Sequence, residues 1–150
     1  MNRVFLAAAV LAAFSSSALA QPVYQTRVGT LSCDASVGIR VIVSSKKSIT
    51  CIFAPSQPGP REIYSATIEK SAREAPALLT TELIWAVITP SNRRFGSLTG
   101  RYVGAPADAG ENALIGGVNR SVVLQPVSLE GGGSINLAAW ISDLKLKPAR

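Results

Sequence analysis

The feature that most constrains this fold is the placement of two cysteines in two separate strand-like segments. Residues 26–33 and 49–53 are rich in β-branched and apolar residues, and each contains one cysteine, Cys33 or Cys51. A third β-branched run, residues 39–43, lies between them in the sequence. Runs of this length, bounded by turn-forming residues, predict short β-strands. The two cysteines therefore report on how three strands are arranged.

An N-terminal signal sequence predicts that these cysteines are oxidised. Residues 1–20 carry a positive charge near their start, at Arg3, followed by an apolar run over residues 4–14. They end in a small-x-small tripeptide. This order is typical of a secretory signal peptide, and the apolar run is too short to remain in a bilayer. We expect a mature domain of residues 21–150, with no transmembrane segment after cleavage, in the periplasm or secreted. Two cysteines in such a compartment predict one disulfide, which stabilises the fold by about 3 kcal/mol.

The predicted disulfide excludes a flat meander of the three strands. In a meander with tight turns, Cys33 and Cys51 would lie about 13 Å apart along the strand direction and about 9–10 Å apart across two strand spacings. A disulfide needs Cα atoms within about 7 Å of each other. The first and third segments must therefore pair directly or face each other across a folded sheet.

The remainder of the chain repeats the pattern of short strands separated by turns. Further strands are expected at residues 62–69, 83–89, 95–103, 122–129 and 135–141. The apolar positions change parity after residue 141, which predicts a bulge near Ser142 and Asp143. The pattern predicts an all-β fold with one domain, either an antiparallel β-sandwich or a small closed barrel. A transmembrane barrel competes, but the mature chain has few aromatic residues for the girdles that it needs.

The chain is basic, with a formal net charge of +6 at pH 7, which falls by one if Arg3 leaves with the signal peptide. An exported basic protein favours anionic partners, and we expect an anionic envelope component, either a lipid head group or a glycan. The alternative is that a modest charge only maintains solubility. The cations are scattered and accompany no aromatic-rich motif, which argues against nucleic acid. The anion-facing candidates are Lys46, Lys47, Arg93, Arg94, Arg101 and Arg120.

The composition argues against most catalytic chemistry. The absence of histidine removes the commonest general base. Two cysteines without histidine cannot supply the usual zinc ligands, and no glycine-rich stretch matches a nucleotide-binding motif, so no metal or cofactor is expected. The nine acidic residues could supply the carboxylate pair of a glycosidase, but their spacing singles out no pair, so no catalytic residue is assigned. Trp140 is a candidate for lining a ligand pocket, with a core position as the alternative.

The order of several segments resembles domain-of-unknown-function family 992, which comprises small exported proteins of Gram-negative bacteria. The carrying segments are VGTLSC (28–33), SITCIFAP (48–55), IWAV (84–87), GSLTGRYVG (96–104), ALIGG (113–117), LQPVSLEG (124–131) and INLAAWISDLKL (135–146). Compared with the family, the chain is shorter around residues 106–111, and Trp140 stands where relatives have smaller residues. The resemblance implies export and an intact disulfide, and it transfers no catalytic residues.

The sequence therefore predicts an exported β-protein with a non-catalytic binding or envelope-associated role. The alternative is a hydrolase that uses carboxylate chemistry on a cell-wall or glycan substrate. The sequence leaves the ligand and the oligomeric state open.

Overall fold

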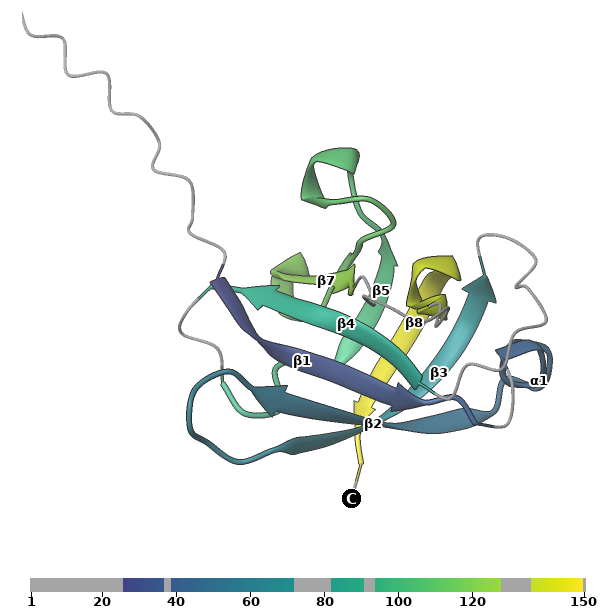
Figure 1. Ribbon diagram of the computed structural model, residues 1–150, viewed down its shortest axis with the longest axis horizontal. Helices are drawn as coiled ribbons and strands as arrows, with labels where there is room; N and C mark the ends of the chain where they lie inside the picture. The colour runs from purple at the N-terminus through teal and green to yellow at the C-terminus, as the bar shows by residue number, and fades with distance from the viewer. Residues whose placement is uncertain (1–25, 37–38, 72–81, 91–93, 128–135, 150) are drawn as a thin grey trace, which may run out of the picture.

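The structure is a computed structural model that describes residues 26–36, 39–71, 82–90, 94–127 and 136–149. Eight antiparallel strands form a closed barrel in the order β1-β2-β3-β8-β5-β6-β7-β4 (Figure 1). This arrangement confirms the all-β fold with one disulfide and selects the barrel from the two predicted architectures. The predicted signal peptide, residues 1–20, lies outside the described residues.

The elements are short, as the spacing of turn residues predicts. The strands are β1 Thr26–Asp34, β2 Ser48–Pro55, β3 Glu62–Ser71, β4 Glu82–Thr89, β5 Gly100–Gly104, β6 Leu114–Gly116, β7 Val122–Pro126 and β8 Ile141–Pro148. One α-helix, α1 Ile39–Ser45, and three 3-10 turns, η1 Ala107–Ala109, η2 Val118–Arg120 and η3 Leu137–Trp140, complete the described part of the chain.

The strand predicted at residues 39–43 is wrong, because this segment forms α1. Its Ile42 side chain is fully buried in the core, so packing has overridden the strand preference of its β-branched residues. With the helix out of the sheet, β1 pairs directly with β2, and Cys33 stands opposite Cys51 in the register. The two cysteines form a disulfide with a Cα–Cα distance of 4.0 Å. Of the two arrangements that the disulfide allows for the first and third segments, the structure has direct pairing.

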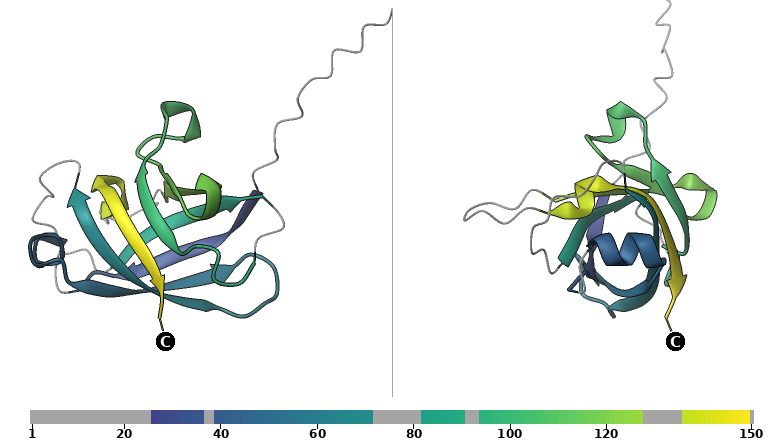
Figure 2. Two further views of the ribbon diagram at one scale, coloured as in Figure 1. Left: turned by 180° about the vertical axis from the view of Figure 1, so that it is seen from behind. Right: turned by 90° about the vertical axis from the view of Figure 1, so that its right-hand side faces the viewer.

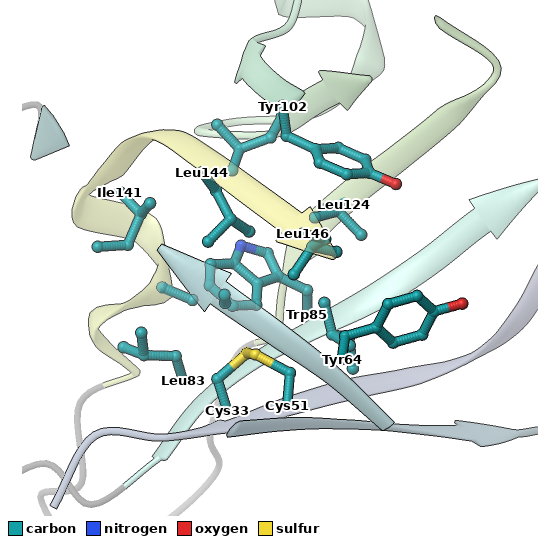
Figure 3. Packing of buried hydrophobic residues seen from close by; sticks show 14 of the residues in the cluster. Cys33, Cys51, Tyr64, Leu83, Trp85, Tyr102, Leu124, Ile141, Leu144 and Leu146 are labelled. Atoms are coloured by element: carbon teal, nitrogen blue, oxygen red, sulfur yellow. A yellow bond between two sulfur atoms is a disulfide. The ribbon is translucent and has the colours of Figure 1, made fainter. Parts of the chain in front are cut away.

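Alternation of inward and outward residues fills the barrel with apolar side chains. On β1, Leu31 and Cys33 point inward between more exposed neighbours, and on β4 Leu83, Trp85 and Val87 do the same. Figure 3 shows the Trp85 indole above the disulfide and among leucines of β7 and β8. The interior of an eight-stranded barrel is narrow enough for side chains to fill, and here buried apolar side chains occupy it.

Two further predicted strands need correction. Residues 95–103 form a strand only from Gly100 onwards, and the preceding residues form a loop. In the segment predicted at 135–141, residues 137–140 form η3, and β8 begins at Ile141. The register between β3 and β8 shifts where Lys70 stands opposite Asp143, so an irregularity lies at the predicted bulge position.

The barrel has two distinct ends. The disulfide end holds Cys33–Cys51 and α1, which lies across the mouth of the barrel in the right-hand view of Figure 2. The opposite end, on the left of Figure 1, holds the start of β1 and the β2–β3, β4–β5 and β6–β7 connections. We call it the arginine end, because exposed arginines lie there in each of these four segments: Arg27, Arg61, Arg94 and Arg120.

Asn136 completes the sheet at the disulfide end, where β4 and β7 separate. Its side-chain oxygen accepts from the backbone N–H of Ile84 at 3.1 Å, and its side-chain nitrogen donates to the Ile84 carbonyl at 2.7 Å. The same nitrogen donates to the Val127 carbonyl at 2.8 Å, and the oxygen also accepts from Ala138 N–H at 3.1 Å. One buried amide therefore bonds β4 as a neighbouring strand does and joins it to η3.

Candidate anion-binding site

The arginine end is closed by the loop of residues 94–99. The Leu98 side chain of this loop is fully buried in the core. Its backbone N–H donates to the Tyr64 hydroxyl at 3.4 Å, and the Tyr102 hydroxyl donates to its carbonyl at 2.7 Å. Figure 3 shows both tyrosine hydroxyls pointing the same way, away from the disulfide. Inward-facing tyrosines of β3 and β5 thus hold the loop from two walls of the barrel.

A buried carboxylate fixes the start of this loop. Oε1 of Glu62 accepts from the Tyr64 hydroxyl at 2.6 Å and from the Gly96 backbone N–H at 2.7 Å. Gly96 has a φ of 77°, in the left-handed region that favours glycine. Burial raises the pKa of Tyr64, which keeps its hydroxyl protonated and able to donate. The loop conformation therefore depends on buried polar contacts.

A cleft of about 620 Å³ lies beside the loop. Its size is within the range of about 300–1,000 Å³ that is usual for small-molecule sites. Two of its apolar side chains remain in solvent, since Phe95 is 72% exposed and Val118 is 57% exposed. The lining residues are Thr89, Pro90, Arg94, Phe95, Gly96, Ser97, Val118, Asn119, Ser121 and Val122.

The second loop of the cleft, η2, has an unusual backbone. Asn119 and Arg120 have φ values of 55° and 53°, which is a rare conformation for arginine. The turn is held by the Ser121 hydroxyl and backbone N–H, which both donate to the Val118 carbonyl, at 2.7 and 3.1 Å. The loop thereby presents Val118 and Arg120 on the surface beside Phe95.

The charge around this cleft is positive. Arg94 lines the cleft, and Arg120 lies between two lining residues. Arg27 and Arg61 add positive charge at the same end of the barrel. Among the described residues, the carboxylate at this end is that of Glu62, which is only 3% exposed. An anion that approaches the arginine end therefore meets exposed guanidinium groups and no exposed carboxylate of the described chain.

A second basic surface lies on the outer wall, where β3, β8 and β5 are neighbours. We call it the β8 hollow; it has a volume of about 340 Å³. Here each of two cations is paired with a carboxylate: Lys46 Nζ lies 3.0 Å from Glu69 Oε2, and Arg101 binds both carboxylate oxygens of Asp143. The remaining lining residues are Lys70 and Lys145.

The Arg101–Asp143 pair dominates the electrostatics of the β8 hollow. The Asp143 side chain is only 5% exposed, and the hydrogen bonds from Arg101 lower its pKa more than burial raises it. The positive charges of Arg101, Lys70 and Lys46 lower this pKa further. The same pair raises the pKa of Arg101. The carboxylate is thus held ionised, and it fixes the guanidinium in place.

The structure separates the six predicted anion-facing residues into two groups. Arg94 lines the cleft and Arg120 stands between two of its lining residues, whereas Lys46 and Arg101 line the β8 hollow. Lys47 is exposed at the disulfide end, between α1 and β2, and Arg93 lies outside the described residues. Trp140 is partly buried and packs against the core.

Sequence reasoning missed the two apolar residues of the cleft. Phe95 was assigned to a strand, and Val118 follows a glycine pair that indicates only a turn. An apolar residue within two positions of an arginine in a turn is the signal that could have found both. In the described segments, no group of three or more potential metal-binding side chains occurs. No described helix has the length and hydropathy to cross a membrane.

Comparison with known proteins assigns the family. The model of a protein family of unknown function, DUF992, matches residues 10–147. The chain belongs to this family. The DUF992 match covers the barrel except for the last residue of β8, together with both loops of the cleft. Neither the curated proteins nor the solved structures gave a match.

Proposed function

We propose that this DUF992 member is an exported, non-catalytic binding protein of the cell envelope, and that its arginine end binds an anionic envelope component. The observation that carries the proposal is the cleft that Arg94 lines, with the exposed Arg120 between two of its lining residues, Asn119 and Ser121. Phosphate and carboxylate groups of lipid head groups or glycans are the anions that guanidinium groups bind best. The four arginines also attract such anions over a distance set by the salt concentration.

Export to the periplasm or the outside of the cell is part of the proposal. The buried Cys33–Cys51 disulfide supports it, because disulfides persist in oxidising compartments. The intact mass of the protein recovered from such a compartment tests it. We expect a chain that begins at residue 21 and contains no free thiol; a full-length chain or free thiols would contradict export.

The alternative of a carboxylate-based hydrolase finds less support. The β8 hollow brings Glu69 and Asp143 together, but each is paired with a cation, and the pKa of Asp143 is lowered. Glycoside hydrolysis needs a general acid whose pKa is raised. The arrangement of these carboxylates therefore supports a role in orienting cations.

Binding of a soluble polyanion tests the proposal at the arginine end. Inorganic polyphosphate is the probe, and the variant Arg94→Gln/Arg120→Gln is compared with the control Lys47→Gln/Lys70→Gln, which removes equal charge at the other end. We expect the arginine variant to bind at least about tenfold more weakly at low salt, and the control to change less than about twofold. The single variant Arg120→Gln leaves the 94–99 loop untouched and should show part of the loss. Equal losses in both double variants would contradict a specific site.

A further inference from the structure

We infer that the arginine end docks on the surface of a lipid bilayer that carries anionic head groups, with Phe95 and Val118 inserted between them. The inference rests on the proposed function and names its partner. It starts from two apolar side chains that the fold leaves in water, 72% and 57% exposed, although most large apolar residues of the described chain are buried. Exposed apolar groups gathered at one place indicate an interaction site.

The two side chains are held at the surface by rigid loops. The loop of Phe95 is fixed by the bond from Gly96 N–H to Glu62 and by the Thr99 hydroxyl, which donates to the Gly96 carbonyl at 2.9 Å. The loop of Val118 is fixed by Ser121. These bonds fix the backbone on which each of the two side chains stands. The loops thus present apolar groups without a further cost of ordering.

The neighbouring charges identify the partner. Arg94 directly precedes Phe95, and Arg120 follows Val118 by two positions, so each apolar residue has an arginine in its own loop. At a bilayer surface, apolar and aromatic side chains enter the boundary between head groups and acyl chains, and arginines bind the phosphates above it. The described carboxylate at this end, Glu62, is buried and does not repel such a surface.

A soluble polyanion explains only half of this arrangement, because it binds the arginines and gains nothing from the two apolar side chains. A bilayer with anionic head groups complements both kinds of residue at once. The position of the loops agrees with it, since both lie at one end of the barrel and line the same cleft. The barrel would then stand with its disulfide end away from the membrane.

Vesicle binding tests the inference. The full mature protein is mixed with vesicles of phosphatidylcholine alone or with phosphatidylglycerol added, and the bound fraction is measured by flotation. We expect binding to the anionic vesicles only. Phe95→Ser/Val118→Ser should weaken this binding at least about tenfold, because it removes the inserted apolar surface. The control is Ile63→Ser, on the outer wall at 53% exposure, and it should change binding less than about twofold.

The same variants distinguish this inference from the proposed function. If Phe95→Ser/Val118→Ser loses vesicle binding and retains polyphosphate binding, both stand. Docking on a bilayer is overturned if this variant binds vesicles as well as the unmodified protein does. It is also overturned if the unmodified protein binds polyphosphate but no vesicles. In both cases the proposal that the arginine end binds anions stands. If the unmodified protein binds neither probe, both are overturned.

A direct reading of insertion comes from Phe95→Trp. Quenching by lipids with brominated acyl chains should reach the new indole in anionic vesicles. In the unmodified protein, Trp85 is fully buried and Trp140 packs against the core, so their emission should change little. Absence of additional quenching in the bound Phe95→Trp variant would overturn the insertion of this loop.

Discussion

The two ends of the barrel are closed by different chemistry. At the disulfide end, a covalent bond joins β1 to β2, Ile42 of α1 packs into the core, and Asn136 joins β4 to η3. At the arginine end, the 94–99 loop contributes one buried leucine, and its backbone is held by hydrogen bonds from Tyr64 and Tyr102. One closure is largely covalent and apolar, and the other is polar.

The difference separates stability from binding. The disulfide end carries contacts whose loss affects the whole barrel, whereas the arginine end carries the cleft, the exposed apolar side chains and four exposed arginines. Loops that bind ligands are commonly the less stable parts of a fold. We therefore expect changes at the disulfide end to lower the free energy of unfolding, and changes at the arginine end to act more on the cleft.

The largest effect is expected from the disulfide. Cys33→Ala/Cys51→Ala should lower the free energy of unfolding by about 3 kcal/mol, because the unfolded chain gains freedom when the loop opens. Urea denaturation of the oxidised protein and the variant measures the difference. Polyphosphate binding at temperatures where both are folded should not change. A variant as stable as the original protein would show that the disulfide end is closed by packing alone.

The next effect is expected from Asn136, which makes four hydrogen bonds. Asn136→Ala removes the partner of the partly buried Ile84 N–H, while the Ile84 carbonyl keeps its bond from the Val127 N–H, and should cost about 2 kcal/mol of unfolding free energy. Thermal or urea denaturation measures it, with Gln57→Ala in an exposed turn as the control. A cost no larger than that of the control would show that Asn136 does not stabilise the disulfide end.

A smaller effect is expected at the arginine end from Tyr102→Phe. The variant loses the hydroxyl that donates to the Leu98 carbonyl and should cost about 1 kcal/mol. Hydrogen exchange should show faster exchange in residues 94–99, while amides of β1 and β2 remain protected. The cysteine variant should speed exchange in β1 and β2 as well, because its effect extends to the whole barrel. Equal changes at both ends in Tyr102→Phe would mean that the ends do not act separately.

The smallest effect concerns pH and lies in the β8 hollow. The pKa of Asp143 is lowered in the folded protein, mainly by the hydrogen bonds from Arg101, so its carboxylate stabilises the fold above the unfolded pKa of about 3.9. This stabilisation is lost as the pH falls through the lowered folded pKa. Acid denaturation should therefore affect the original protein more steeply than Asp143→Asn. In an Arg101→Gln background, this difference should shrink.

The sequence predicted those parts of the fold that depend on local pattern or on fixed bond geometry. The local pattern located the strands β3 and β4. The reach of a disulfide excluded a flat meander and required the segments of Cys33 and Cys51 to pair directly or to face each other across a folded sheet. The sequence failed at residues 39–43 and at Phe95. In both places the local pattern favours a strand, and the need to close an end of the barrel produces a helix or a loop.

The candidate site was predicted only in part, because the charge of a residue does not show which residue it will pair with in the fold. Arg94, Arg101 and Arg120 look alike in the sequence, and the partner of Arg101, Asp143, is distant along the chain. Only the register between β5 and β8 brings these two together. The signal peptide and the location stay predictions.

The strand order of the barrel also has a consequence for the timing of folding. β8, the last of the eight strands in the chain, lies between β3 and β5 and hydrogen-bonds to both. The sheet cannot close until this strand is available, and pairing over such long sequence separations is slow. The barrel therefore stays open until residues 141–148 have joined the sheet, and until then the facing edges of β3 and β5 lack their partner.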